Sequence, residues 1–165
     1  WYSPEAFDEM GYDIPESMED LKVLMDQIVE DGGTPWCLGL GSGAATGWPA
    51  TDWVEDLMLR THSPEDYDAW VSNELKFDDP KVIEEIEEYG YFARNDEFVL
   101  GGASVAANTD FRDSPKGLFS IPPGCFMHRQ ASFIPAFFPD DAEIGVDVDF
   151  FYFPAYAEKD LGSPV

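Results

Sequence analysis

The residues best suited to chemistry in this sequence surround a glycine-rich turn. Residues 34–53 read TPWCLGLGSGAATGWPATDW, so a short apolar run passes through the turn into a helix opened by Pro49. The start of a helix presents backbone N–H groups that lack partners within the helix, and Trp48 places an indole beside them. A mouth of this kind usually faces a ligand. We therefore expect five residues of the turn to contact one: Ser42, Gly43, Ala44, Thr46 and Trp48.

A second concentration of polar side chains follows the apolar run 124–128. The sequence HRQASF over residues 128–133 brings together an imidazole, a guanidinium, an amide and a hydroxyl where this run ends. These groups could hydrogen-bond within the core, or they could line the same mouth as the glycine turn, and both interpretations stay open. Under the second, the candidate ligand-binding residues are His128, Arg129, Gln130, Ser132 and Phe133.

The aromatic side chains favour a sugar as the ligand. An indole or phenyl face packs against the C–H side of a sugar ring, while nearby amides and hydroxyls bond the edge of the ring. Trp36, Trp53 and Trp70 fall on faces of predicted strands or helices and are expected in the core. Trp48 suits a ligand platform as well as it suits the core.

Three cofactor or catalytic patterns at the glycine turn are disfavoured. Gly39, Gly41 and Ala44 satisfy a loose dinucleotide fingerprint, but the next segment is two helices and not the strand that would supply an acidic residue. No Gly-Lys-Ser or Gly-Lys-Thr is present to form a phosphate-binding loop. Ser42 lacks the flanking glycines of a nucleophile elbow. We expect no cofactor.

Acidic residues and histidines offer little for catalysis or metal binding. Asp52 with Glu55 or Asp56 could act as the acid and nucleophile of a glycosidase, but carboxylates one turn apart at a helix start usually serve the helix dipole. His62 and His128 are too far apart in sequence for a helix-borne metal pair, and no metal site is expected. We predict a protein that is not an enzyme; the alternative is a small carbohydrate-active enzyme domain that uses Asp52 and Glu55.

Composition excludes several partners. The 165 residues include 34 acidic and 9 basic side chains and carry a net charge of −25, so nucleic acids and anionic membrane surfaces would be repelled. No apolar run reaches the roughly 18 residues of a membrane span. The chain opens with Trp1 and without a signal-peptide pattern, so we expect a chain trimmed at its start.

Two cysteines, Cys37 and Cys125, each lie in a short apolar run that reads as a strand. Two adjacent strands could bring their Cα atoms within the distance of about 4.4–6.8 Å that a disulfide requires. The alternative is a pair of buried free thiols. A disulfide would favour an exported location.

Helix signals dominate the rest of the chain. Caps or prolines open five predicted helices, at Ser3-Pro4, Ser17, Pro49, Ser63-Pro64 and Asp79-Pro80. Weaker signals indicate a helical piece over residues 108–119 and a short helix or turn over 129–138. Strands are predicted over residues 36–40, 124–128 and 146–153, the last from alternating apolar and acidic residues. The predicted fold class is α/β, a small sheet flanked by helices in a single unit, 1–165.

Two longer stretches resemble the extracellular solute-binding proteins of bacterial sugar ABC importers, in their α-glucoside-type branch. They are GGTPWCLGLGSGAATGWPATDWVEDLMLR and, downstream, SPKGLFSIPPGCFMHRQASFIPAFFP. The likeness extends from WYSPEAFDEMGYDIPESMEDL, which is similar to the stretch after a first interlobe crossing, to FFYFPAY, which is similar to the approach to a second.

The resemblance implies one lobe of a periplasmic-binding-protein-like fold, the other lobe being absent. Such a receptor closes on a mono- or oligosaccharide and delivers it to membrane permease subunits, outside the cell membrane or in the periplasm. Its membrane association would come only from a lipid anchor outside this chain, as in a lipoprotein. The resemblance places residues 42–48 and 128–133 in the cleft. Because half a cleft leaves much of a ligand in water, we expect the lobe alone to bind sugar weakly at best.

Overall fold

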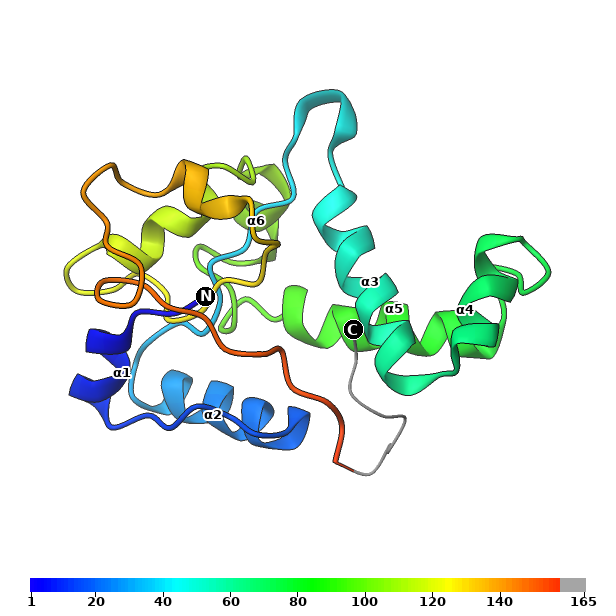
Figure 1. Cartoon of the computed structure of the whole chain (residues 1–165), viewed down its shortest axis with the longest axis horizontal. Coiled ribbons are helices and arrows are strands. Elements are labelled where there is room, and N and C mark those ends of the chain that lie inside the picture. Colours follow the sequence, from blue (N-terminus) through cyan, green and yellow to red (C-terminus); the bar gives the residue numbers. More distant parts are fainter. Residues whose placement is uncertain (158–165) are drawn as a thin grey trace.

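A computed structural model describes residues 1–157 of the chain and shows a largely helical molecule (Figure 1). The α-helices are α1 (Pro4–Met10), α2 (Met18–Glu30), α3 (Trp48–Thr61), α4 (Pro64–Val71), α5 (Pro80–Ala93) and α6 (Ala103–Asn108). Three short 3-10 helices are η1 (Gly43–Ala45), η2 (Ser114–Phe119) and η3 (Ile134–Phe137). The helical piece predicted over residues 108–119 is therefore wrong in its bounds, because α6 ends where that piece should begin and η2 covers only its second half.

Four of the five predicted helix starts are confirmed with side-chain caps, and the fifth helix, α3, begins at Trp48 after Gly47 without one. The side chains of Ser3, Ser17 and Ser63 each accept a hydrogen bond from a backbone N–H in the first turn of α1, α2 and α4, and Asp79 does so for α5. Ser17 also forms a capping box with Asp20, whose carboxylate accepts the backbone N–H of Ser17 at 3.1 Å. These caps satisfy N–H groups that a helix leaves without partners, so the local sequence is sufficient to place the starts of α1, α2, α4 and α5.

The predicted sheet is not confirmed. Within residues 1–157 the extended segments meet only at isolated bridges, such as those that join Trp36 to Val99 and to Met127. Trp36 donates its backbone N–H to Phe98 at 2.8 Å, and Cys37 donates to Met127 at the same distance. The runs 36–40 and 124–128 therefore lie side by side as expected, but their pairing ends after one or two residues.

The third predicted strand, 146–153, has no continuous pairing either. Its alternating pattern predicts one buried apolar face, yet Val148 alone is fully buried, while Val146, Phe150 and Tyr152 are 56%, 61% and 87% exposed. Asp149 pairs with Tyr2 through reciprocal backbone hydrogen bonds of 3.0 and 2.9 Å. The segment thus crosses the surface as an irregular strap.

The core is centred on aromatic rings from separate elements. Trp36 from the central extended segment packs edge-on against Trp53 of α3, with ring centroids 5.3 Å apart, and both contact Phe92 of α5. Both indoles are buried, as predicted. Trp70 is only half-buried, near Phe77 at the α4–α5 end of the molecule, because α4 extends away from this core (Figure 1).

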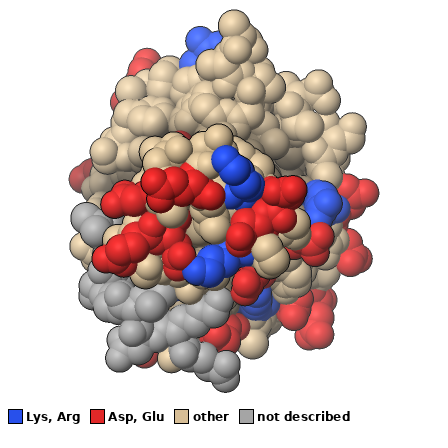
Figure 2. All heavy atoms as spheres, turned by 90° about the vertical axis from the view of Figure 1, so that its right-hand side faces the viewer, with Lys and Arg blue, Asp and Glu red and all other residues tan. Residues whose placement is uncertain are grey.

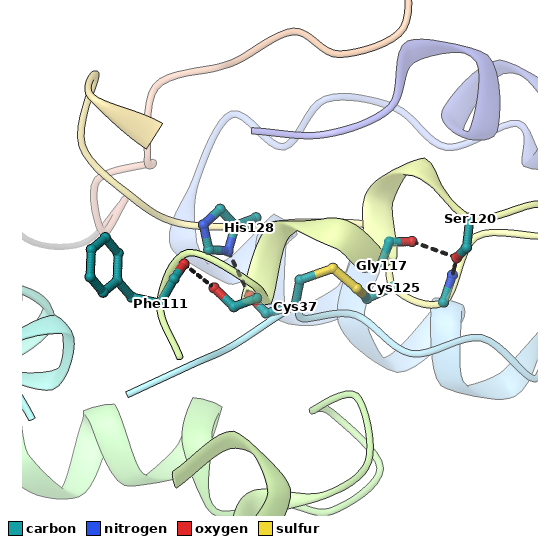
Figure 3. Close-up of a disulfide and its surroundings, with 8 residues drawn as sticks. Cys37, Phe111, Gly117, Ser120, Cys125 and His128 are labelled. Atoms are coloured by element: carbon teal, nitrogen blue, oxygen red, sulfur yellow. Dashed lines mark hydrogen bonds between the residues drawn. A yellow bond between two sulfur atoms is a disulfide. The ribbon is translucent and has the colours of Figure 1, made fainter. Parts of the chain in front are cut away.

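Cys37 and Cys125 form a disulfide between the two central extended segments (Figure 3). Their Cα atoms are 5.4 Å apart, and both residues are buried. The backbone of Gly117 passes so close to the two sulfur atoms that a side chain there would collide with them. The bridge connects residues 88 positions apart in the chain and fixes segment 125–128, which leads to the second candidate binding segment.

Charged side chains gather on the face formed by the α4–α5 end (Figure 2). Asp and Glu residues form a broad band there with a few Lys and Arg residues between them. One ion pair of α4 and α5 joins Lys81 to Asp66 at 2.5 Å. The upper part of the same view is mostly uncharged. Among the described residues, no helix has the length and apolar character required to cross a membrane.

Candidate functional site

The two candidate binding segments meet at an aromatic cluster. The rings of Trp48, at the start of α3, and Phe133 lie 5.8 Å apart between centroids. Phe111 contacts both rings, at 5.2 and 6.0 Å, and contacts Phe137 at 5.5 Å. We call these four residues the aromatic rim. Phe133 is 42% exposed and Trp48 is partly exposed, so the rim offers ring surface to a ligand.

Sequence reasoning missed Phe111 and Phe137, because their place in the rim depends on pairing between distant segments. Gly41 donates its backbone N–H to Thr109 at 2.8 Å and accepts that of Phe111 at 2.9 Å. A side chain on Gly41 would lie 2.9 Å from the carbonyl oxygen of Thr109, so glycine permits this close approach. The residue pair Gly41 and Phe111 has no signal in a single sequence.

The glycine turn itself projects from the body as a closed loop before α3 (Figure 1). The hydroxyl of Thr46 accepts the backbone N–H of Ser42 at 3.0 Å and donates to the carbonyl of Gly43 at 2.8 Å. Ala44 and its neighbours in the loop are exposed. These loop residues therefore stand beside Trp48 at the rim and do not line the pocket described next.

A pocket of about 420 Å³ lies between α3, the segment after Cys125 and the strap 150–153. The rim residues are not in its lining, but Ser132 of its wall directly precedes Phe133 in the chain. Four of the predicted residues, His128, Arg129, Gln130 and Ser132, are in its wall. The remaining lining residues are Trp1, Trp36, Asp52, Asp56, Arg60, Met127, Ala131, Phe150, Phe151, Tyr152 and Phe153. Aromatic surface and hydrogen-bonding groups are thus combined in one hollow, as in sites for sugars.

His128 is a buried structural link at the base of this pocket. It is 2% exposed, and its Nδ1 lies 2.7 Å from the carbonyl oxygen of Cys37 (Figure 3). Burial lowers the pKa of His128 to about 4, so the imidazole is neutral at pH 7 and its Nδ1–H donates to that carbonyl. Nε2 is buried and has no hydrogen-bond partner among residues 1–157.

Arg129 is the most firmly held polar group of the wall. Its Nη2 lies 2.9 Å from Oδ2 of Asp56 and donates to the backbone carbonyl of Asp52 at 3.4 Å. Its guanidinium lies over the rings of Trp53 and Phe153, at 4.9 and 5.0 Å from their centroids. A guanidinium stacked and paired in this way keeps one orientation.

Asp52 and Glu55, two carboxylates of α3, have separate surroundings. Asp52 lines the pocket, and burial raises its pKa against the opposing effect of nearby Arg129. Glu55 instead lines a different, apolar groove between α3, α4 and α5, where it accepts a 2.9 Å hydrogen bond from Tyr67. Because a glycosidase needs both carboxylates at one glycosidic bond, this separation does not favour an enzyme that uses Asp52 and Glu55. Asp56 does line the same pocket as Asp52, where its Oδ2 lies 2.9 Å from Nε of Arg60 and 2.9 Å from Nη2 of Arg129.

Gln130 is held in the pocket wall mainly through its backbone. Its carbonyl accepts the indole N–H of Trp1 at 3.0 Å, and its side-chain Oε1 accepts the backbone N–H of Ala131 at 2.9 Å. Ser132 is exposed beside it. The amide nitrogen of Gln130 and the hydroxyl of Ser132 are therefore the flexible hydrogen-bonding groups of this wall.

A further cluster, which sequence reasoning missed, joins the end of α3 to α5. His62 Nε2 lies 3.3 Å from Oε1 of Glu85 and 4.0 Å from Oε2 of Glu84. Glu85 is buried and also accepts a hydrogen bond from Thr61 at 2.5 Å. The acidic and histidine atoms all lie within 4.8 Å of one another, away from the pocket residues.

Comparison with known proteins finds relatives over the whole chain. The chain is 63% identical to the alpha-glucosides-binding periplasmic protein AglE of Rhizobium meliloti over 166 residues, and 43% identical to the osmoprotective compounds-binding protein GgtB of Synechocystis sp. over 165 residues. The aligned segment covers all of this chain but only 36% and 39% of those proteins. The chain thus spans little more than a third of their length. No protein-family model matches it.

Solved structures show the same relationship. The bacterial solute receptor AcbH, described as having an exclusive substrate preference for β-D-galactopyranose, superposes with a TM-score of 0.76 at 25% identity, over 94% of this chain and 36% of AcbH. A chitin oligosaccharide binding protein superposes with a TM-score of 0.72 at 19% identity, over 94% of this chain and 37% of that one. The resemblance to part of a sugar solute-binding protein is therefore confirmed in sequence and in fold.

Proposed function

We propose that this chain is the carbohydrate-binding lobe of a solute-binding protein that serves an ABC importer. The observation that supports it most directly is the meeting of Trp48 and Phe133 beside a pocket lined by polar side chains. The two segments are far apart in the sequence, and their convergence was the expectation on which the sugar interpretation depended. The identity to an α-glucoside-binding relative supports α-glucosides as the ligand class.

The chemistry of the pocket suits an uncharged polyhydroxylated ligand. The rim rings would cover the C–H face of a sugar, Asp52 would accept hydrogen bonds from its hydroxyls, and Arg129 would donate to its oxygen atoms. Because the pocket is open, the opposite face of the sugar would be covered by a second lobe that closes over it. The proposed unit 1–165 is thus one half of a binding cleft.

The proposed partners and location follow the relatives. A receptor of this class would meet permease subunits at the extracellular face of the membrane or in the periplasm. The net charge of −25 gives the chain itself no attraction to anionic lipid headgroups. Catalysis is not part of the proposal, and incubation with an α-glucoside is expected to release no glucose.

A chimera tests the proposed function. This chain would replace the aligned segment of the Rhizobium meliloti relative, to which it is 63% identical, and the parent protein would serve as the control. We expect titration calorimetry to give Kd values for a panel of α-glucosides within about tenfold of the parent, that is within about 1.4 kcal/mol. A folded chimera that binds none of the parent's sugars would refute the proposal.

Trp48 is the sharpest single test within that chimera. We expect Trp48→Leu to weaken sugar binding about tenfold or more, because it removes the ring that the sugar would stack on. Trp70→Leu removes an equally large indole outside the pocket and is expected to leave Kd unchanged. Equal losses in both variants would show that the rim is not the binding surface.

The isolated 165-residue chain should bind sugar only at millimolar concentrations, because it would supply one half of the cleft. Micromolar affinity in titration calorimetry would contradict this expectation.

A further inference from the structure

Two of the four arginines of the chain converge on one carboxylate in the pocket wall. Oδ2 of Asp56 lies 2.9 Å from Nε of Arg60 and also 2.9 Å from Nη2 of Arg129. Asp56 and Arg60 are one turn apart on α3, whereas Arg129 arrives from the segment after the disulfide. In a chain with a net charge of −25, such a gathering of positive side chains is unusual and requires a reason.

Asp56 is the only acidic group among residues 1–157 that forms an ion pair with both guanidiniums. Both guanidiniums also lie over the ring of Phe153, at 5.1 Å for Arg60 and 5.0 Å for Arg129. Two positive groups around one ring repel each other, and a negative charge between them offsets this repulsion. The Asp56 carboxylate therefore balances a pair of charges that would otherwise separate.

The ion pairs leave specific N–H groups without an acceptor. Nη1 of Arg60 and Nε of Arg129 are buried and make no hydrogen bond within the described part of the chain. Arg60 as a whole is 7% exposed, and both arginines are in the pocket wall. Asp56 thus uses its oxygen to hold the two side chains in place and leaves part of their donor capacity unused.

We propose that Asp56 is a positioning residue for ligand binding, which fixes Arg129 as the hydrogen-bond donor for oxygen atoms of the bound saccharide. The inference rests on the proposed function for the nature of the ligand. It assigns to Asp56 a role that the sequence did not indicate, since carboxylates on this turn of α3 were expected to serve the helix dipole. Saccharide binding then depends on the negative charge of Asp56, which acts by holding Arg129 in place.

A double-mutant cycle in the chimera separates this role from direct contact and from simple destabilisation. We expect Asp56→Asn and Arg129→Gln each to weaken sugar binding about tenfold, and the double variant to bind no more than about twofold more weakly than Arg129→Gln alone. Asp56→Glu keeps the charge and should restore most of the affinity. Asp66→Asn breaks the ion pair with Lys81 away from the pocket and is the matched control.

A second measurement needs no ligand. In nitrogen-15 spectra of the 165-residue chain, the Nε–H signal of Arg129 should exchange slowly with water, and Asp56→Asn should make it exchange as fast as that of an exposed arginine. Fast exchange in the unmodified chain, or additive losses of affinity in the cycle, would overturn the inference. If the chimera bound no sugar, the proposed function would fail, while the exchange measurement would still decide whether Asp56 holds Arg129.

Discussion

At the scale of single residues, His128 shows how burial changes a side chain that the sequence presents as polar and available. Its position in HRQASF suggested a ligand contact, but the structure places the ring under the pocket, hydrogen-bonded to Cys37. Burial holds the pKa of His128 at about 4, whereas an unfolded chain would have a histidine pKa near 6.5. The imidazole is therefore neutral in the folded protein over the physiological range.

This difference predicts a pH dependence of stability. Well above pH 6.5 His128 is neutral in both the folded and the unfolded state, so it does not make stability depend on pH there. As the pH falls from about 6.5 to about 4, the unfolded chain binds a proton that the folded protein does not, so the free energy of unfolding decreases, by about 2 kcal/mol at pH 5. Urea unfolding at pH 7 and at pH 5 measures it.

The control replaces the imidazole without removing its hydrogen bond. Asn at position 128 can present an amide N–H near the place of Nδ1, and the variant should lose the His128 part of the pH dependence. His62→Gln removes the other histidine and should retain it. An identical pH dependence in His128→Asn and in the unmodified chain would contradict the neutral buried imidazole.

The residues of the site were predictable to different degrees. Trp48 and Phe133 could be proposed because a large aromatic next to a turn and next to a polar run is visible in the sequence itself, and the structure brings the two rings together. Phe111 was not, since its contact with Trp48 is created by hydrogen bonds between Gly41 and segment 109–111. Asp56 looked like any acidic residue near a helix start, and only the arrival of Arg129 gives it another role.

At the scale of elements, the helices with side-chain caps were predictable, whereas α6, which has none, and the sheet were not. A cap such as Ser17 acts on backbone groups three residues away, so the sequence contains the whole signal. Pairing of Trp36 with Val99 and Met127 instead joins segments more than 60 residues apart. Extended conformation at 36–40 was correct, but whether such a segment becomes part of a sheet depends on neighbours that no local pattern reveals.

The disulfide holds two extended segments together where a sheet was predicted, so its removal should lower the free energy of unfolding. The cross-link between residues 88 positions apart restricts the unfolded chain, which corresponds to about 4 to 5 kcal/mol in the chain-entropy estimate. We expect the double variant Cys37→Ser, Cys125→Ser to lose stability of that order in urea unfolding. The unmodified chain, unfolded in urea with a reducing agent, is the control and should lose a similar amount. A loss below about 1 kcal/mol in the double variant would show that other contacts hold the two segments together without the disulfide.

At the scale of the whole molecule, charge is the dominant property. The excess of 34 acidic over 9 basic residues was known from composition, and Figure 2 shows where part of it gathers, in a band on the α4–α5 end. Like charges on one surface repel and oppose the compact state. The upper part of that view is mostly uncharged, so this repulsion is unevenly distributed over the face shown.

Salt should therefore stabilise the protein. We expect the thermal midpoint to rise by several degrees between about 0.1 M and about 1 M sodium chloride, because the screening length falls from about 10 Å to about 3 Å. A variant that neutralises four exposed acidic residues of this end should start from a higher midpoint and respond less to salt: Asp68→Asn, Glu74→Gln, Asp78→Asn and Glu87→Gln. A midpoint that stays constant or falls with salt would argue against surface repulsion.

The closely packed base of the glycine turn limits which of its positions can be mutated. At Gly39 and Gly41 a side chain would meet backbone oxygen atoms of Thr109 at 2.9 Å, so these two positions anchor the loop to the body. At the tip, Ala44 and Ala45 are exposed, whereas Gly43 has a φ of +57° that would strain any side chain. A library that randomises Ala44 and Ala45 and keeps the three glycines should therefore yield folded chains, and under the proposed function some of these would have new sugar preferences.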